Sequence, residues 1–385
     1  MKKLALLGAT GSIGTQVLEI VKNNPDYRIK SIAFGNNVVL GRKIIEEFQP
    51  EFVAVRNDTI KEDIFRQFPQ LKIGVGEAGL IEAATFVAPG DYLINALVGV
   101  LGLVPTVAAI EKGINILLAN KETLVVGGEI IMPLVKKHGV MLLPIDSEHS
   151  AIFQCLHCGK KEEISQLILT ASGGPFLKKS REDLKKVSLA QALAHPNWKM
   201  GPKITIDSAT MVNKGLEIIE AHHLFAVPYD RLRALIHPES IIHSLVEFTD
   251  RTVMAQMSLP DMRLPIQYAL TYPQRVANAL FPAFDFSKGW NLHLLPMDMD
   301  RFPLVKWAYE VGRAGGIMPA VYNAANEAAV SLFLNNKITF LEIEKIIIQA
   351  VENAVNVSNP SLEQLIKVSR QVNEQILQSY EVENG

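Results

Sequence analysis

The turn Gly8-Ala9-Thr10-Gly11-Ser12-Ile13-Gly14 follows a short apolar run at residues 3–7 and precedes a segment of helical periodicity at residues 13–21. Glycines leave room for a pyrophosphate to approach the backbone, and a helix N-terminus adds oriented N–H donors with a partial positive charge. A strand, a glycine-rich turn and a helix in this order predict a dinucleotide-binding site at this turn.

The same alternation of apolar runs and helical patterns continues through residue 146. Further strands are expected at residues 28–34, 52–55, 92–97, 114–118 and 140–144, and a second helix at 39–48. Strands that alternate with helices at this spacing favour parallel βαβ units. The fold class is therefore predicted to be α/β, with a Rossmann-like parallel sheet in residues 1–146.

The uncharged stretch from Tyr92 to Ile110 approaches the length of a membrane span. Four residues interrupt its apolar pattern, namely Asn95, Gly99, Gly102 and Pro105. We therefore predict a buried strand, a turn and a helix here, and no association with a membrane.

The pattern changes after residue 146. Strand-like stretches at residues 166–170, 203–206, 241–248 and 253–258 predict a central α+β domain with a mixed or antiparallel sheet over residues 147–271. Residues 272–297 hold several prolines and aromatics without periodicity, which is typical of a linker. Residues 298–385 are predicted to form a helical domain, because Thr339 with Glu342 and Ser361 with Gln364 fit capping boxes.

Composition narrows the class of protein. The 385 residues carry a net charge of −2, so no basic field recruits nucleic acid or anionic lipid. Only two cysteines occur, Cys155 and Cys158, which favours a reducing compartment and a soluble cytoplasmic enzyme. Their C-x-x-C spacing has no second pair to complete a zinc site, so we expect two ordinary apolar side chains.

The end of the second predicted strand indicates which dinucleotide binds. An NAD enzyme usually places an acid there for the ribose hydroxyls, but no acid occurs between Asp26 and Glu46. Because a carboxylate would repel a 2′-phosphate, its absence favours NADP. The nearest cations along the sequence are Arg42 and Lys43.

Two polar segments suggest a metal and an anion site. Asp146 and Glu148 follow an apolar strand and, in extended chain, share one face from which both reach a hard cation; a capped helix start with solvated acids is the alternative. If residues 207–217 are helical, Asn213, Lys214 and Glu217 lie within one turn. Glu217 would then add an oxygen ligand, unless its pairing with Lys214 is only a surface ion pair.

Two loops complete the polar set. Residues 170–175 expose backbone N–H groups beside Ser172, which suits an anion. Residues 194–201 place His195, Trp198 and Lys199 between turn residues, as expected of a lid over a polar ligand; a packed aromatic in an ordinary loop is the alternative. His222, His223 and His243 are expected to be structural.

With these motifs, the sequence resembles the 1-deoxy-D-xylulose 5-phosphate reductoisomerase family. The similar segments occur in the family's order at residues 8–14, 118–125, 146–154, 170–176, 195–201, 207–217, 260–263 and 323–327. The resemblance implies an NADPH-dependent and metal-dependent oxidoreductase of isoprene biosynthesis. It would convert 1-deoxy-D-xylulose 5-phosphate to 2-C-methyl-D-erythritol 4-phosphate by rearranging the carbon skeleton and then transferring hydride. Retro-aldol and 1,2-shift routes both stay open.

The resemblance also implies roles for individual residues. The cofactor would contact Thr10, Gly11, Ser12, Ile13, Gly35, Asn36, Asn37, Asn120, Glu122 and Gly201. The divalent metal, Mg²⁺, Mn²⁺ or Co²⁺, would be held by Asp146, Glu148 and Glu217. The sugar phosphate substrate would contact Lys121, Ser147, Glu148, Ser172, His195, Ser208, Asn213, Lys214 and Glu217. Lys121, Asp146, Glu148 and Glu217 are the expected catalytic set, with Trp198 and Met200 in the lid.

One departure from the family pattern concerns Asn36, whose position commonly carries Lys or Arg. It bears on the preference for NADPH over NADH. The resemblance further implies a homodimer formed through the central domain. Two other functions are considered: a metal-free NADP-dependent dehydrogenase of another phosphorylated aldehyde, and an NADP-binding redox sensor that uses Cys155 and Cys158.

Overall fold

A computed structural model describes residues 1–22, 24–198 and 200–382. The chain forms two compact units. The first contains Met1–Thr123, Glu129–Ser150 and Asp261–Phe281, and the second contains Leu124–Gly128, Ala151–Pro260 and Pro282–Gly385. The sequence-based division at residues 146, 271 and 297 is finer than these units and stays a prediction.

The first unit is built on a seven-stranded parallel sheet with the order β4-β3-β2-β1-β5-β6-β7. Its strands are β1 (Lys2–Leu7), β2 (Tyr27–Phe34), β3 (Phe52–Val55), β4 (Lys72–Val75), β5 (Tyr92–Asn95), β6 (Asn115–Leu118) and β7 (Leu142–Pro144). The direction of winding reverses between β1 and β5. Loops at such a switch point form the crevice where open α/β sheets bind ligands.

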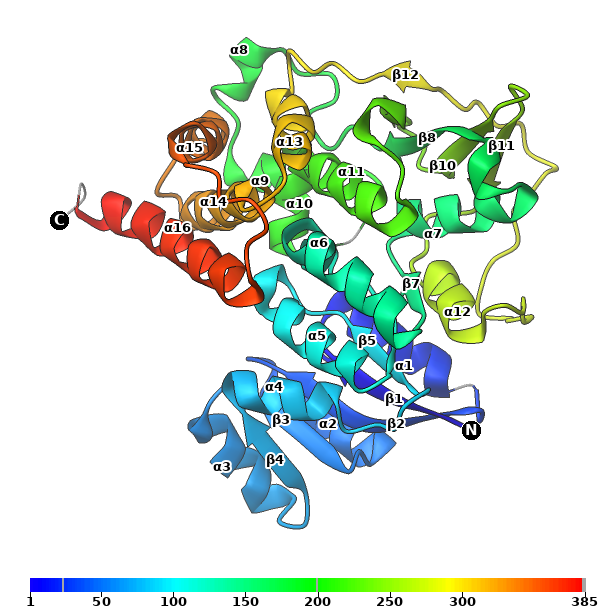
Figure 1. Cartoon of the computed structure of the whole chain (residues 1–385), viewed down its shortest axis with the longest axis vertical. Coiled ribbons are helices and arrows are strands. Elements are labelled where there is room, and N and C mark those ends of the chain that lie inside the picture. The colour runs from blue at the N-terminus through cyan, green and yellow to red at the C-terminus, as the bar shows by residue number, and fades with distance from the viewer. Residues whose placement is uncertain (23, 199, 383–385) are drawn as a thin grey trace. The chain divides into compact units, whose positions relative to one another are not determined.

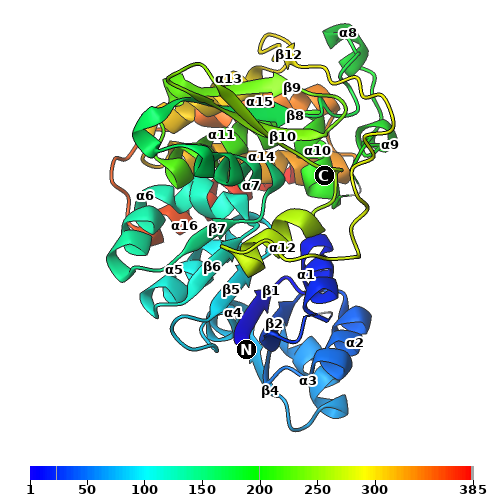
Figure 2. The same ribbon diagram turned by 90° about the vertical axis from the view of Figure 1, so that its right-hand side faces the viewer.

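Helices cover both faces of this sheet. They are α1 (Ser12–Lys22), α2 (Val38–Phe48), α3 (Asp58–Gln67), α4 (Gly76–Ala84), α5 (Leu103–Glu111) and most of α6 (Lys121–His138), joined by α12 (Arg263–Thr271). Figure 2 shows α1 and α2 on one face and α4 and α5 on the other. Right-handed crossovers from β1 outward in both directions produce this arrangement. The predicted Rossmann-like α/β fold is confirmed.

Burial explains why the strands read as continuous apolar runs. Every residue of β3 and β5 is buried, as expected for central parallel strands covered on both faces. The uncharged stretch from Tyr92 forms β5, the short 3₁₀ helix η1 (Gly99–Gly102) and α5, as predicted. The edge strand β4, which has no fully buried residue, was missed.

The second unit contains a five-stranded mixed sheet with the order β11-β10-β8-β9-β12. Its strands are β8 (Ile164–Ala171), β9 (Leu232–Ile236), β10 (Ile242–Phe248), β11 (Val253–Met257) and β12 (Leu295–Pro296). Strands β8 and β9 are parallel and the other pairings are antiparallel. The predicted mixed sheet is confirmed. Residues 272–297, which were expected to be a linker, contain the short strand β12, which pairs with β9.

One predicted strand is wrong: residues 203–206 lie in helix α10 (Pro202–Ala209). The β-branched run Ile204-Thr205-Ile206 favoured a strand locally. Pro at the first helical position follows the N-cap Gly201, and the Thr205 hydroxyl donates to the Gly201 carbonyl at 2.8 Å. A helix start of this kind, with packing of the buried side chains, outweighs the β-propensity.

Of the remaining helices of the second unit, those after residue 298 follow the predicted helical pattern, whereas α7 (Ser147–Cys155), α8 (Arg181–Leu184) and α9 (Leu189–Ala192) were not predicted (Figure 1). Around the sheet lie these three helices, of which α7 begins in the first unit, and α11 (Val212–Phe225). The C-terminal helices are α13 (Pro303–Ala314), α14 (Met318–Leu334), α15 (Phe340–Asn353) and α16 (Leu362–Val382). The capping boxes at Thr339 and Ser361 form as predicted.

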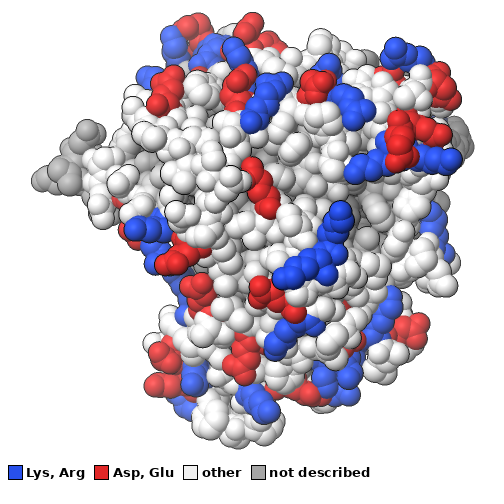
Figure 3. All heavy atoms as spheres, in the orientation of Figure 1, with Lys and Arg blue, Asp and Glu red and all other residues white. Residues whose placement is uncertain are grey.

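Charges of both signs are interspersed over the face shown in Figure 3. Mixed surface charge of this kind does not create a one-sign field. Across the described residues, none of the helices combines the length and the apolar character that crossing a membrane requires.

Candidate functional site

The predicted dinucleotide turn connects β1 to α1 at the switch point of the sheet. Gly8 has φ +85°, and a Cβ there would lie 2.4 Å from the Ala96 carbonyl oxygen. A Cβ on Gly14 would lie 2.2 Å from the Gly8 carbonyl oxygen. Side chains at these two positions would therefore force the turn open. The N–H groups of Thr10 to Ile13 lie at or just before the first turn of α1, where a phosphate binds most favourably.

The end of β2 supplies the second cofactor element. Beyond the strand, the Asn37 side chain caps α2 by accepting from the Leu40 N–H at 3.2 Å. The space beside Gly35 is open, because no other atom lies within 4 Å of where a Cβ would be. The Asn36 side-chain oxygen accepts from Arg56 Nη1 at 3.0 Å, a contact that the sequence did not reveal.

The Asn120 side chain organises the loop that follows β5. Its amide nitrogen donates to the carbonyl oxygens of Leu97 and Gly99, each at 3.0 Å, and to the Glu122 carboxylate at 2.9 Å. Asn120 and Glu122 are both almost fully buried. Because this loop lies beside the glycine turn, they fix the shape of the wall against which the predicted nicotinamide would lie.

Two expected catalytic residues meet at the edge of the same sheet. Lys121 follows β6 and Asp146 follows β7, and the two strands are parallel neighbours with Leu118 opposite Pro144. Lys121 Nζ lies 2.7 Å from Asp146 Oδ2. Burial would raise the pKa of Asp146, but Lys121 and His149 outweigh it and hold this pKa well below its usual value. Asp146 is therefore an ionised hard oxygen donor at neutral pH.

Glu148 does not share an extended strand with Asp146, so that detail of the prediction is wrong. Helix α7 begins at Ser147, and the Asp146 carbonyl accepts the Ser150 N–H at 2.8 Å. The Ser147 hydroxyl donates to Glu148 Oε2 at 2.6 Å. Ser147 and Glu148 thus form one polar group in the first turn of a helix, directly after Asp146.

In the second unit, Ser172 and His195 form one hydrogen-bonded pair. His195 Nδ1 accepts the N–H groups of Asn197 at 3.2 Å and Trp198 at 3.0 Å. The proton of the neutral ring is therefore on Nε2, which donates to the Ser172 hydroxyl oxygen at 3.0 Å. Burial lowers the pKa of His195 below 6.5, which also favours this neutral form.

Close backbone approach brings Ser208 to the same place. Gly173 and Gly174 both have positive φ, and a Cβ on Gly174 would lie 2.7 Å from the Ser208 carbonyl oxygen. Ser208 is in the last turn of α10, and Met211, with φ 63°, joins it to the first turn of α11. The backbone of Ser208 therefore lies against the loop that carries Ser172, whose hydroxyl pairs with His195, and hydroxyl and imidazole groups are donor types that anion binding uses.

The first turn of α11 carries the other three predicted residues, and the helical spacing is confirmed. Asn213 Nδ2 donates to Glu217 Oε1 at 2.5 Å, and Lys214 Nζ pairs with Glu217 Oε2. The Lys214 side chain is 2% exposed and that of Glu217 is 0% exposed, which excludes an ordinary surface ion pair. Burying two charges is costly, so such pairs are retained mainly where function requires them.

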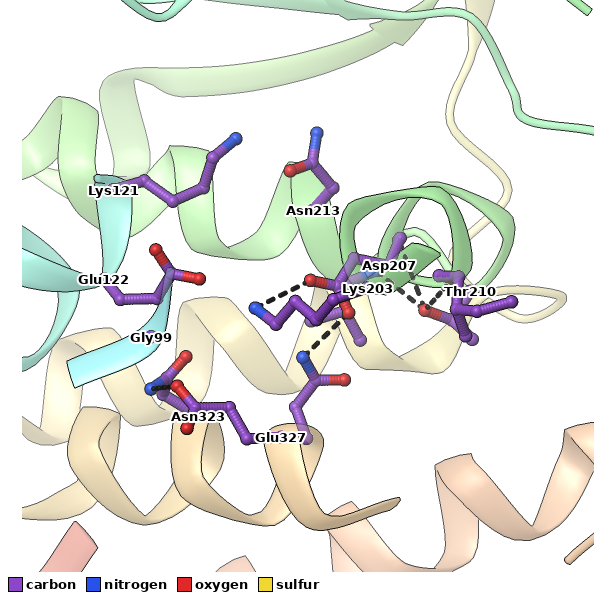
Figure 4. Close-up of polar contacts among 12 residues, drawn as sticks. Gly99, Lys121, Glu122, Lys203, Asp207, Thr210, Asn213, Asn323 and Glu327 are labelled. Carbon is purple, nitrogen blue, oxygen red and sulfur yellow. Dashed lines mark hydrogen bonds and ion pairs between the residues drawn. The ribbon is translucent and has the colours of Figure 1, made fainter. Parts of the chain in front are cut away.

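A buried network in the second unit, shown in Figure 4, was not predicted. Asp207 accepts from Lys203 Nζ at 2.8 Å and from Asn326 Nδ2 at 2.9 Å. In the next turn of α14, Asn323 donates to Glu327 at 2.9 Å. Asp207 therefore ties α10 to α14 immediately before Ser208. In the sequence, the only sign of this network is the group of polar residues Asn323, Asn326 and Glu327 within an otherwise apolar helix.

The expected lid is anchored at one end. Asn197 Nδ2 donates to the Pro238 carbonyl at 2.6 Å and to the Ser240 hydroxyl at 2.8 Å. The Trp198 ring lies 6.2 Å from the His243 ring, centroid to centroid. Met200 is partly exposed, Gly201 has open space beside it, and Lys199 lies outside the described residues. Trp198 and Met200 lie in the loop before α10.

The residues set aside on sequence grounds have structural partners. The His222 ring stacks on Tyr229, and its Nδ1 lies 2.8 Å from the Val227 carbonyl oxygen. His243 Nε2 lies 3.1 Å from the Ser258 carbonyl oxygen. Burial and Cys158 raise the pKa of the Cys155 thiol to about 11, so little thiolate exists for redox chemistry.

Both implied cofactor groups fit the donors present. The glycine turn offers a cradle that a Cβ would fill, together with the N-terminus of α1. Asp146, Glu148 and Glu217 offer only carboxylate oxygens, the donors that Mg²⁺ and Mn²⁺ prefer. A glycine turn at the switch point of a parallel sheet, and hydroxyl, imidazole and buried carboxylate groups in the second unit, are typical of a nucleotide-dependent enzyme of phosphorylated substrates.

Comparisons with known proteins identify the family. Three family models match: the 1-deoxy-D-xylulose 5-phosphate reductoisomerase domain at residues 4–128, its C-terminal domain at 142–225, and the DXP reductoisomerase C-terminal domain at 257–375. The reductoisomerase of Geobacillus sp. (strain WCH70) is 53% identical over 370 residues, 96% of this chain and 97% of that protein. That of Halalkalibacterium halodurans is 49% identical over 373 residues, 96% and 97% of the two chains.

Solved structures agree with the sequence relatives. A crystal structure of DOX-P reductoisomerase in complex with NADPH, fosmidomycin and magnesium has a TM-score of 0.93 and 37% identity, covering 100% of this chain and 99% of that one. The Zymomonas mobilis enzyme in complex with NADPH has a TM-score of 0.90 and 37% identity, covering 99% of each chain. This chain belongs to the 1-deoxy-D-xylulose 5-phosphate reductoisomerase family, which confirms the resemblance.

Proposed function

We propose that this protein converts 1-deoxy-D-xylulose 5-phosphate to 2-C-methyl-D-erythritol 4-phosphate, using NADPH and a divalent metal ion. Family membership over nearly the whole chain supports the reaction. Related structures that contain NADPH and magnesium support the two cofactors. The structural observation that carries the proposal is the buried Glu217, held by Asn213 and Lys214 beside the donors of an anion pocket.

The metal ligands in this proposal are Asp146, Glu148 and Glu217. All three are ionisable oxygen donors next to a lysine or a hydroxyl, and none lies on a fully exposed surface. When bound, the metal polarises the substrate ketone and the adjacent hydroxyl as a Lewis acid, and NADPH supplies the hydride.

The chain's own groups orient the substrate. Ser172, His195, Ser208, Asn213 and Lys214 would hold the phosphate, with His195 as a neutral Nε2–H donor. Lys121, buried beside Asp146, presents an ammonium group to the oxygenated carbons, and Ser147 adds a hydroxyl. Trp198 and Met200 would exclude water as the loop closes, which protects a reactive aldehyde before reduction.

The cofactor side of the proposal divides between two elements. Thr10, Gly11, Ser12 and Ile13 would bind the phosphates, and Gly35, Asn36 and Asn37 the adenosine ribose. Asn120 and Glu122 shape the wall on the nicotinamide side, to which Gly201 would also contribute. These assignments rest on matched family positions and on the local geometry.

We also propose that the enzyme is a homodimer of the cytoplasm. Strand β11 is an edge of the mixed sheet, and its outward residues Val253 and Met257 are 47% and 41% exposed. An exposed apolar edge strand presents unpaired backbone N–H and C=O groups to which another chain can add, here a second copy. Neither cysteine is in a disulfide, as expected in a reducing compartment.

The decisive assay follows the absorbance of NADPH after addition of 1-deoxy-D-xylulose 5-phosphate. Oxidation is expected only when both the sugar phosphate and Mg²⁺ or Mn²⁺ are present, and EDTA should abolish it reversibly. Turnover that persists in EDTA would instead support a metal-free dehydrogenase. No turnover with this substrate in any metal would refute the proposal.

The redox-sensor alternative has a separate test. Replacing Cys155 and Cys158 together by Ala should leave NADPH oxidation close to the wild-type rate, because neither thiol has a place in the site. Loss of turnover in a double variant that keeps its melting temperature would reopen that alternative.

A further inference from the structure

The end of β2 has room for a phosphorylated ribose but lacks a cation of its own. Gly35 leaves open space, and the next two residues are the uncharged Asn36 and Asn37. The 2′-phosphate of NADPH carries the charge that distinguishes it from NADH. Preference for NADPH therefore needs a cation from elsewhere in this part of the fold.

The next strand of the sheet supplies that cation. Strands β2 and β3 are parallel, with Phe34 opposite Val55, so Asn36 and Arg56 emerge at the same edge. The Arg56 Nη1 atom donates to the Asn36 side-chain oxygen at 3.0 Å. Arg56 is exposed and, among the residues that the structure describes, has no carboxylate at ion-pair distance. No described carboxylate therefore neutralises its positive charge.

The cations nearest in the sequence are less suitable. Arg42 forms an ion pair with Asp63, so its guanidinium is already engaged. Lys43 is exposed on α2, and within the described part of the chain no hydrogen bond directs it toward Asn36. Arg56 differs from both because its hydrogen bond to Asn36 holds a planar guanidinium with several N–H donors next to the open space at Gly35.

We propose that Arg56 binds the 2′-phosphate of NADPH and provides the cofactor preference that Asn36 alone does not. The inference rests on the proposed function, since it specifies how the cofactor of that reaction is selected. The guanidinium can donate two parallel hydrogen bonds to phosphate oxygens, and Asn36 fixes its orientation through the remaining donor. Arg56 thus supplies, from the end of β3, the cation that the end of β2 lacks.

The test measures binding directly. Dissociation constants of NADPH and NADH are measured by nicotinamide fluorescence for the wild type, Arg56→Gln, and the matched control Lys43→Gln. A hydrogen bond to a charged group contributes about 1.5–3 kcal/mol, so Arg56→Gln should weaken NADPH about 10- to 100-fold. Its affinity for NADH should stay unchanged, and Lys43→Gln should alter neither.

A compensating variant separates recognition from general damage. Adding Asn36→Lys to Arg56→Gln should restore much of the lost NADPH affinity, because it returns a cation to the end of β2, next to the open space at Gly35. Equal weakening of NADPH and NADH by Arg56→Gln, or an unchanged NADPH affinity, would overturn the inference.

The outcomes distinguish this inference from the proposed function. If the wild type reduces 1-deoxy-D-xylulose 5-phosphate while Arg56→Gln keeps the normal preference, only the role of Arg56 fails. If Arg56→Gln loses the preference but the wild type does not turn over that substrate, the reaction fails and the binding role stands.

Discussion

The loop around His195 fixes the protonation state of its ring. Two backbone N–H groups occupy Nδ1, so a proton can be added there only if both hydrogen bonds break. Burial acts in the same direction and lowers the pKa of His195 below 6.5. A neutral donor to Ser172 is the consequence, and it persists at neutral pH.

This arrangement predicts a pH dependence of stability. A histidine whose pKa is lower in the folded state binds a proton more readily when unfolded, so its favourable contribution is complete above 6.5. As pH falls below 6.5, the wild type should lose more of its free energy of unfolding than His195→Gln does. An NMR titration of the imidazole, assigned with that variant, should give a pKa below 6.5. A pKa at or above 6.5 would contradict the tautomer assignment.

The contacts of some site residues could be predicted from the sequence, and those of others could not. Asn213, Lys214 and Glu217 are local, since helical spacing alone brings them together, and their prediction is confirmed as geometry. Arg56 was missed because its contact with Asn36 depends on the pairing of two strands separated by a helix. No window of sequence around Asn36 contains it. The roles of these residues in binding stay predictions.

Among the elements, helices α6 and α11 approach closely at Gly128. A Cβ on Gly128 would lie 2.3 Å from two ring atoms of His223, in the stretch of α6 that belongs to the second unit. Burial and the neighbouring His222 lower the pKa of His223 to about 4, consistent with an enclosed ring. The contact leaves no space for a methyl group.

Gly128→Ala should therefore be destabilising. Overpacking costs about 1–3 kcal/mol. The helix propensity of Ala returns about 1 kcal/mol, so a net loss of up to about 2 kcal/mol is expected. Thermal unfolding provides the measurement, and Gly289→Ala, which has open space beside it, is the control. Adding His223→Ala should relieve the clash; a Gly128→Ala variant as stable as wild type would show that the helices separate freely.

The secondary structure was predictable where local signals and burial agree. The first unit combines continuous apolar strands with helices of clear periodicity, and the parallel sheet follows from their alternation. The error at residues 203–206 has the opposite cause, because a β-branched run stands where Pro202 and buried packing impose a helix. Asp207 was then missed, since its partner Asn326 is 119 positions distant.

For the whole molecule, the exposed edge strand β11 makes a specific prediction about assembly. Val253 and Met257 point outward from a strand that has a partner on one side only. If a second copy covers this edge, Met257→Lys should convert a dimer to a monomer, because a charge in an apolar interface is costly. Light scattering after size-exclusion chromatography measures the mass, with the exposed Val355→Lys as control. A monomeric wild type would refute the dimer, and a dimeric Met257→Lys would remove β11 from the interface.

The proposed reaction requires one divalent cation, for which Asp146, Glu148 and Glu217 are the proposed ligands. Titration with Mn²⁺, followed by electron paramagnetic resonance, measures its binding without requiring turnover. We expect one tight site per chain in the wild type. Glu217→Gln should lose this site and nearly all NADPH oxidation while binding NADPH normally, whereas Glu310→Gln, an exposed acid, should resemble the wild type. Unchanged Mn²⁺ binding in Glu217→Gln would contradict the central claim.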